Sequence, residues 1–197
     1  MATTTAAPAP SYPLIYDVEY PERLSRWLIF VKWLLAIPHY IVLYALNIVS
    51  RVITLVAFFA ILFTKRYPRG LFNLWLGIHR WSANVSAYTG LMRDEYPPFS
   101  MDADKYPVTF DVQYAEELNR WLPLVKWLLA FPHYIALILL FVASLFVYIV
   151  VFFSILFTTK FPRGMFDFVV GVQRWGLRVN AYVGLVRDEY PPFSLKP

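Results

Sequence analysis

Two long apolar segments dominate the pattern of hydrophobic and polar positions along the chain. Residues 41–63 and 135–157 each run for 23 residues; the first contains only Arg51 as a charge and the second contains none. A helix of ~20 apolar residues is enough to cross a hydrocarbon core of ~30 Å. The pattern therefore predicts that the chain inserts into a membrane.

Shorter patterns flank each apolar segment. Hydrophobic residues alternate with polar ones over residues 12–20 and again over 106–114, which predicts two strands, each with one buried face. Such strands could pair, one from each part of the chain, if the helices supply a surface for them. Residues 71–88 show helical spacing with an interleaved polar face, which predicts an amphipathic helix in the plane of a membrane interface. The matching segment, residues 165–186, carries two arginines and is a poor span.

The chain is one module written twice. Shifting the sequence by 94 positions aligns residues 12–100 with 106–194 without a gap, and the octapeptide RDEYPPFS recurs unchanged at 93–100 and 187–194. A tandem duplication fixes the expected organisation. We expect a disordered leader over residues 1–11, a membrane module over 12–100, a linker over 101–105 and a second membrane module over 106–197.

The course of each apolar block through the membrane has two solutions. Pro38 and Pro132 are expected to kink or break the helix that precedes each block. In one solution residues 27–37 lie at the interface and the apolar run crosses alone as a single span. In the other, the block forms a transmembrane hairpin that turns near Asn47 and Ser50. We favour the hairpin, because it places almost every Lys and Arg toward one side. Arg51 would then reach the far interface from the apex.

Composition supports the membrane assignment and narrows the chemistry. Hydrophobic residues make up 59% of the 197 residues, charged residues only 16%, and the net charge is +5. This charge favours anionic lipid head groups, and no nucleic-acid-binding motif accompanies it. The chain has no cysteine, which excludes disulfides and thiolate chemistry. The expected lipid anchors are Trp27, Lys32, Trp33, Arg69 and Trp81, with Trp121, Lys126, Trp127, Arg163 and Trp175.

Candidate chemistry is sparse. His39 and His133 hold matched places in the repeated PHY, and such a pair could ligate haem or a chlorophyll-type pigment. The simpler interpretation, which we favour, is that each histidine satisfies carbonyls freed by the neighbouring proline. The acidic and basic residues of RDEYPPFS favour an ion-paired cap at a helix end over a catalytic cluster. No metal-ligand spacing or catalytic constellation appears in the sequence, so we expect no enzyme and no metal site.

Three repeated motifs carry a resemblance to a known family. RWLxxxKWLLAxPHY, PRG followed by Leu or Met and Phe, and RDEYPPFS are similar to those of small bacterial membrane proteins grouped as a domain of unknown function, often in two copies. The resemblance covers nearly the whole chain beyond the first ten residues. It implies a multi-pass protein of the bacterial cytoplasmic (inner) membrane and brings no activity or catalytic residues.

The sequence thus predicts an all-α membrane protein of two tandem modules, each with a Pro-kinked hairpin or single span, an interfacial amphipathic helix and a short extramembrane strand. The expected function is that of a non-enzymatic structural or accessory protein that associates with lipid and with a partner membrane complex or itself, as a homo-oligomer or subunit. It would shape the bilayer if it fills one leaflet more than the other. The alternatives are a small transporter or channel, which the apolar spans disfavour, and a haem- or pigment-binding subunit.

Overall fold

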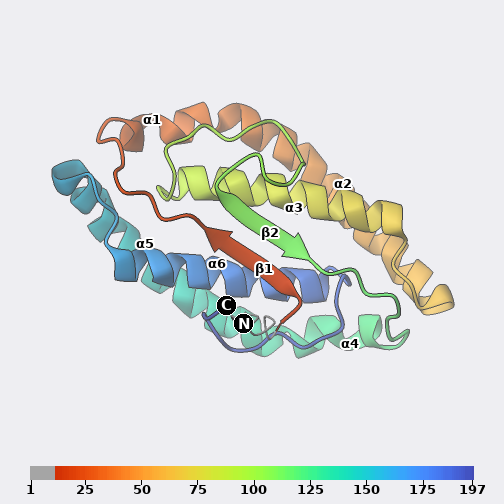
Figure 1. The fold of residues 1–197 in the computed structure, drawn as a ribbon. Helices are drawn as coiled ribbons and strands as arrows, with labels where there is room; N and C mark the ends of the chain where they lie inside the picture. The colour runs from red at the N-terminus through yellow and green to blue at the C-terminus, as the bar shows by residue number, and fades with distance from the viewer. Residues whose placement is uncertain (1–11) are drawn as a thin grey trace, which may run out of the picture.

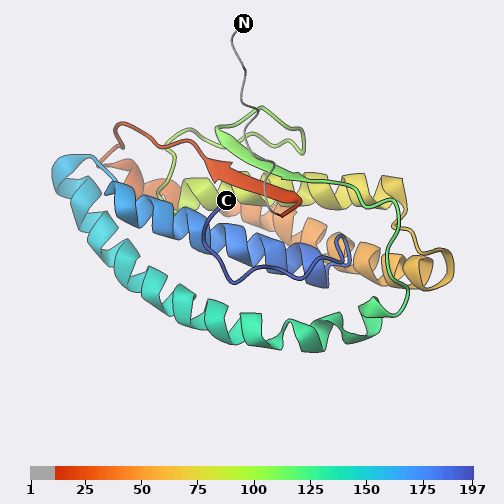
Figure 2. The ribbon, with the colours of Figure 1, turned by 60° about the horizontal axis from the view of Figure 1, so that its bottom comes forward.

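The computed structural model describes residues 12–197, and the leader predicted for residues 1–11 lies outside the described residues. Three layers are visible in Figures 1 and 2: a two-stranded sheet, a middle pair of helices, and an outer pair on the far side from the sheet. The sheet contains β1 (Leu14–Val18) and β2 (Val108–Val112), and the middle layer contains α3 (Arg69–Thr89) and α6 (Arg163–Val183). The outer layer contains α2 (Ile37–Thr64) and α5 (Phe131–Thr158). A short helix precedes each of them, α1 (Leu28–Leu35) before α2 and α4 (Leu122–Leu129) before α5.

The predicted breaks at the prolines are confirmed. Pro38 and Pro132 occupy the first turn of α2 and of α5, where a residue without an N–H leaves no helical hydrogen bond unmade. A single residue, Ala36 or Ala130, separates each long helix from the short one before it. The helix therefore ends and restarts at the residue before Ile37 or Phe131, next to the proline.

The predicted hairpin is wrong. α2 is one uninterrupted helix of 28 residues, and α5 has the same length. At the expected turn, the Asn47 amide donates to the Leu43 carbonyl oxygen at 2.8 Å, and in the second repeat the Ser144 hydroxyl donates to the Leu140 carbonyl oxygen at 2.8 Å. Both polar side chains bond to the preceding turn of their own helix, so nothing in these segments competes with helical geometry. The single continuous helix of the alternative solution is the one observed.

The sheet joins the two repeats, as predicted. β1 and β2 pair antiparallel, with Tyr16 opposite Phe110, and these two residues are equivalents in the 94-residue repeat. A local twofold axis therefore passes through this pair, perpendicular to the sheet, and relates one repeat to the other. The inward residues of β1 are buried and the outward ones are exposed, as the alternation indicated.

The repeats are interlocked. β1 of the first repeat packs on α6 of the second, and β2 packs on α3. The Tyr12 hydroxyl donates to the Glu189 carbonyl oxygen at 3.0 Å, and its equivalent Tyr106 donates to that of Glu95 at 2.7 Å. Each repeat thus lends its N-terminal arm to the other, so segments 12–100 and 106–197 share one core.

The predicted amphipathic helices are present, but their surroundings differ from the expectation. α3 and α6 lie between the sheet and the outer helices, so both of their long faces are covered. The guanidinium groups of Arg174 and Arg178 are buried, at 6% and 1% exposure. Arg174 donates to the Tyr16 carbonyl oxygen at 2.8 Å, and Arg178 to the Lys196 carbonyl oxygen at 3.0 Å. Backbone carbonyls from other segments accept hydrogen bonds from both groups, although Nε of Arg178 has no partner.

Candidate functional site

The repeated octapeptide straps the junction between α1 and α2. Lys32 of α1 is almost fully buried, at 2% exposure, and its ammonium group lies 2.8 Å from the Asp94 carboxylate. The same ammonium donates to the Arg93 carbonyl oxygen at 2.6 Å. Farther along the octapeptide, the Tyr96 hydroxyl donates to the Leu35 carbonyl oxygen at 3.1 Å, where α1 ends. The octapeptide, called the strap below, thus stabilises the point where the helix is interrupted beside the proline.

The second octapeptide makes the same contacts with the second junction. The Lys126 ammonium lies 2.8 Å from the Asp188 carboxylate and 2.7 Å from the Arg187 carbonyl oxygen. The Tyr190 hydroxyl donates to the Leu129 carbonyl oxygen at 3.1 Å. Arg187 is buried and pairs with Glu189, whose side chain is half exposed, so the expected ion-paired cap is present with its cation enclosed. The contacts of the octapeptide are the same in both repeats, which accounts for its unchanged sequence.

His39 and His133 sit beneath the straps, and both are fully buried. The Trp81 indole N–H donates to His39 Nδ1 at 3.1 Å, so Nδ1 is the acceptor and Nε2 carries the proton of the neutral ring. Phe99 of the strap stacks on the imidazole, with ring centroids 3.9 Å apart. His133 repeats this geometry with Trp175 at 3.0 Å. A flat macrocycle would reach either imidazole only after the strap had been displaced.

The predicted lipid anchors divide into two groups. Trp27 and Trp33 are exposed by 81% and 64%, and their repeat equivalents Trp121 and Trp127 by 65% and 64%. These indoles are free to contact lipid. Four others, Lys32, Lys126, Trp81 and Trp175, are buried in the two strap junctions and are not available to lipid.

Arg69 and Arg163 lie at the start of α3 and α6, with side chains exposed by 66% and 65%. Each guanidinium stacks on a tyrosine of the other repeat, Tyr114 at 4.5 Å and Tyr20 at 4.6 Å from the ring centroid. Each also has an exposed acidic partner: Arg69 lies 2.5 Å from the Glu116 carboxylate and Arg163 lies 3.2 Å from that of Asp167. Such exposed pairs are weak, so a phosphate could compete for either guanidinium.

The outer helices present a broad apolar surface. Ile37–Thr64 and the stretch Leu122–Thr158, in which α4 and α5 follow one another, are long and apolar enough to cross a membrane. Only about a fifth of the most apolar window in each is buried, at 22% and 17%. Large side chains such as Ile41, Leu139 and Phe146 are each exposed by about two thirds (67%, 66% and 67%). An exposed apolar surface of this size is typical of a membrane-binding or protein-binding face.

The opposite face of the molecule is charged. Asp17 of β1 and Asp111 of β2 point away from the core, with side chains exposed by 69% and 55%. Each is paired with an arginine of the helix below: Arg174 lies 3.2 Å from Asp17, and Arg80 lies 2.7 Å from Asp111. Sequence reasoning missed these pairs because each joins residues far apart in the chain.

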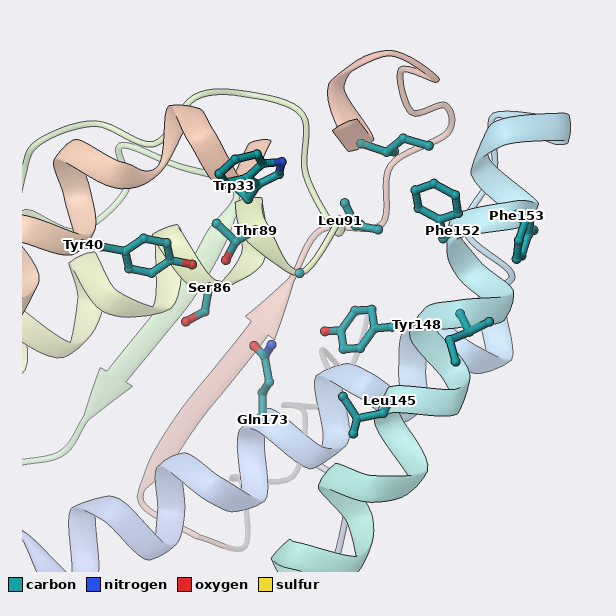
Figure 3. Close-up of a pocket in the computed structure, with 13 residues that line it drawn as sticks. Trp33, Tyr40, Ser86, Thr89, Leu91, Leu145, Tyr148, Phe152, Phe153 and Gln173 are labelled. Carbon is teal, nitrogen blue, oxygen red and sulfur yellow. The ribbon is translucent and has the colours of Figure 1, made fainter. Parts of the chain in front are cut away.

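A groove runs between α2 and α5, with α3 and α6 as its floor. It comprises two adjoining cavities of about 870 Å³ and 730 Å³, which share Ser86 of α3 and Gln173 of α6. In Figure 3 the polar ends of Tyr40, Ser86, Tyr148 and Gln173 point into the larger cavity, while Leu145, Phe152 and Phe153 form its apolar wall. The smaller cavity contains Arg51, which therefore lines a groove and not a hairpin apex.

Two matched regions, residues 26–101 and 121–194, fit the family described as a domain of unknown function (DUF4389). Because they cover more than half of the chain, the protein belongs to this family and carries its domain twice. No curated protein and no solved structure matches the chain. The octapeptides and both strap junctions fall inside the matched regions, whereas β1 and β2 fall outside them.

Proposed function

We propose that this protein is a non-enzymatic membrane accessory protein that lies within one leaflet, with its outer helices among the acyl chains and its sheet toward water. One observation carries the proposal: the two outer faces of the layered structure have opposite chemistry. Aliphatic and aromatic side chains cover the face formed by α2 and α5, whereas carboxylates project from the sheet. A slab with this polarity matches the boundary between water and hydrocarbon.

The sheet argues against an orientation in which α2 and α5 stand upright. Arg80 and Arg174, which pair with the sheet carboxylates, lie near the middle of the 21-residue helices α3 and α6. Because α3 packs along α2 and α6 along α5, upright helices would bring these ion pairs to the middle of the bilayer. A charge there costs about 2.5–3.5 kcal/mol or more. With the helices lying flat, the same carboxylates face water.

Helix length favours the flat orientation as well. The 28 residues of α2 extend over about 42 Å, and residues 122–158 over about 55 Å if straight, both well beyond a hydrocarbon core of ~30 Å. Figure 2 shows α4 and α5 as one long arc beneath α6. An arc that lies along a leaflet needs no match to bilayer thickness.

A slab that occupies one leaflet displaces lipid from that leaflet alone, which favours curvature. Exposed Arg69 and Arg163 and the four exposed tryptophans supply contacts for anionic head groups at the rim. The proposed setting is the bacterial inner membrane, as the family resemblance implies. There the protein would associate with copies of itself or with a partner membrane complex.

Cysteine labelling tests the orientation, and the natural chain offers no competing thiol. Asp17→Cys, Glu22→Cys and Lys65→Cys are introduced singly, and sealed membrane vesicles of known orientation are treated with an impermeant maleimide. Glu22 precedes α1 and Lys65 follows α2, so the flat orientation predicts that all three label from the same side. Ile48→Cys, on the apolar face, should label only after detergent is added.

Labelling of Glu22→Cys and Lys65→Cys from opposite sides would refute the flat orientation, as would protection of Asp17→Cys. Bilayer shaping is measured separately, by electron microscopy of liposomes at increasing protein density. We expect tubulation or a smaller vesicle diameter. An unchanged diameter at high density would remove bilayer shaping from the function and leave lipid association in place.

A further inference from the structure

The groove between α2 and α5 differs from the rest of the duplicated protein because its two walls are unlike. The strap junctions keep the same residues in both repeats, whereas the groove keeps some, such as Tyr40 and Tyr134, and changes others. Asn47 and Arg51 of α2 correspond to Phe141 and Leu145 of α5, and all four line the groove. One wall is therefore polar and cationic where the other is apolar. A twofold scaffold that is asymmetric at its groove fits an asymmetric ligand.

The smaller cavity has the chemistry of an anion site. Arg51 is the one charged residue among the side chains that line either cavity in the described part of the chain, and no Asp or Glu lines them. Within residues 12–197 it has no ion-pair partner. The same cavity is also lined by neutral polar side chains, among them Ser50, Thr54 and Asn180. An unneutralised guanidinium among amides and hydroxyls favours an acidic group.

The larger cavity has the chemistry of an acyl site. Ile149, Phe152 and Phe153 of α5 line it, together with Ile29 of α1. Polar groups remain at the floor, where Ser86 and Gln173 join the two cavities. The order along the groove is therefore a cation, then hydroxyl and amide groups, then hydrocarbon. A phospholipid has the same order of acidic head group, esters and acyl chain.

We propose that this groove binds one anionic phospholipid, with its phosphate at Arg51, its ester groups at Ser86 and Gln173, and an acyl chain against Phe152 and Phe153. Cavities of about 870 and 730 Å³ are of the size that holds one such molecule. The proposal rests on the proposed function for access, because the lipid enters from the leaflet in which α2 and α5 lie. In that orientation Arg51 is an unpaired charge at the depth of the acyl chains, which is costly, and the lipid phosphate neutralises it. The protein would then hold a specific lipid in addition to its bulk lipid contacts.

Arg51→Leu tests the head-group site. Leucine is a suitable replacement because it already occupies the matched position 145 in the second repeat. Purified full-length protein in a neutral detergent is titrated with short-chain phosphatidylglycerol, short-chain phosphatidylcholine and inorganic phosphate, and tryptophan fluorescence is recorded. We expect a preference for phosphatidylglycerol that falls about tenfold or more in the variant. Arg66→Leu, which changes an exposed arginine outside the groove, is the matched control and should keep the preference.

Gly176→Phe tests the groove itself. Gly176 lines the smaller cavity, and a Cβ added there meets no atom within 4 Å, so the new ring would project into open space. We expect loss of phosphatidylglycerol binding with an unchanged melting temperature. Equal binding of both lipids by the natural protein, or full binding by Gly176→Phe, would overturn the proposal. Phosphate bound as tightly as the lipid would assign the site to a free anion.

The two proposals fail separately. Arg51→Leu and Gly176→Phe should still enter vesicles and keep the labelling pattern of Asp17→Cys, Glu22→Cys and Lys65→Cys, because each changes a single groove residue and adds no charge to the apolar face. A lost lipid preference with a retained pattern supports the groove. A changed pattern in the natural protein refutes the flat orientation whatever the groove binds.

Discussion

Asp94→Asn should destabilise the protein strongly, because it leaves a buried ammonium without its counter-charge. Lys32 is 2% exposed and lies 2.8 Å from Asp94, whose own side chain is 24% exposed. Loss of one partner from a buried ion pair costs about 3–5 kcal/mol, and the partial exposure of the carboxylate points to the lower end, about 3 kcal/mol. In a chain of this size that corresponds to a fall of about 6–12 °C in melting temperature.

Thermal unfolding in detergent, followed by circular dichroism, measures the effect. The double variant K32M/D94N removes the charge with its partner and should be more stable than D94N alone. Asp188→Asn makes the same change at the second junction, where Lys126 is 1% exposed, and should lower the melting temperature by a similar amount. The single variant K32M completes the comparison. A shift of less than 2 °C for D94N, or a loss in the double variant equal to the sum of the losses in K32M and D94N, would show that the ion pair does not stabilise the strap.

Two further predictions concern the ends of the straps. Gly171→Ala should lower the melting temperature, because its Cβ would lie 2.8 Å from Leu195 Cβ and 2.9 Å from the Leu195 carbonyl oxygen, whereas Gly164→Ala, with nothing within 4 Å, should be neutral or slightly stabilising. Burial opposes the ionisation of Glu95, but hydrogen bonds from Arg93 outweigh it and the pKa of Glu95 lies below its ordinary value. The carboxylate therefore adds stability above its unfolded pKa that is lost as the pH falls through the folded one, so unfolding scans from pH 7 to pH 3 should show a smaller loss for Glu95→Gln than for the natural protein.

Local sequence patterns were enough to predict part of the fold. The period-two alternation gave the strands and their buried faces, and Pro38 gave the break before α2, because both effects act within a few residues. The hairpin is wrong because a bias of Lys and Arg toward one side does not require a turn in the helix. Asn47 marks the expected turn, but its amide bonds to the preceding turn of its own helix, as does the hydroxyl of Ser144, the equivalent of Ser50.

Residue roles that depend on distant partners were not predictable. Lys32 beside Trp33 has the composition of a lipid anchor, and nothing local indicates that its partner is Asp94, 62 positions later. Arg51 in an apolar run suggested the apex of a hairpin. The groove that it lines could not be predicted, because the facing wall of the groove comes from the other repeat. The pairing of β1 with β2 was expected from the sequence, but the packing of β1 on α6 and of β2 on α3 leaves no local mark, because it joins segments far apart in the chain.

The twofold axis bears on which side of the membrane each copy of the octapeptide faces. Identical polar motifs suit identical surroundings, and a module with one upright crossing would place its two copies on opposite sides of the membrane. The register of Tyr16 opposite Phe110 sets the axis perpendicular to the layers. In the proposed flat orientation this axis is also the membrane normal, so both octapeptides lie at the same depth and face the same side without a second crossing. The bias of Lys and Arg toward one side, which had favoured a hairpin, then follows from a slab that never leaves its leaflet.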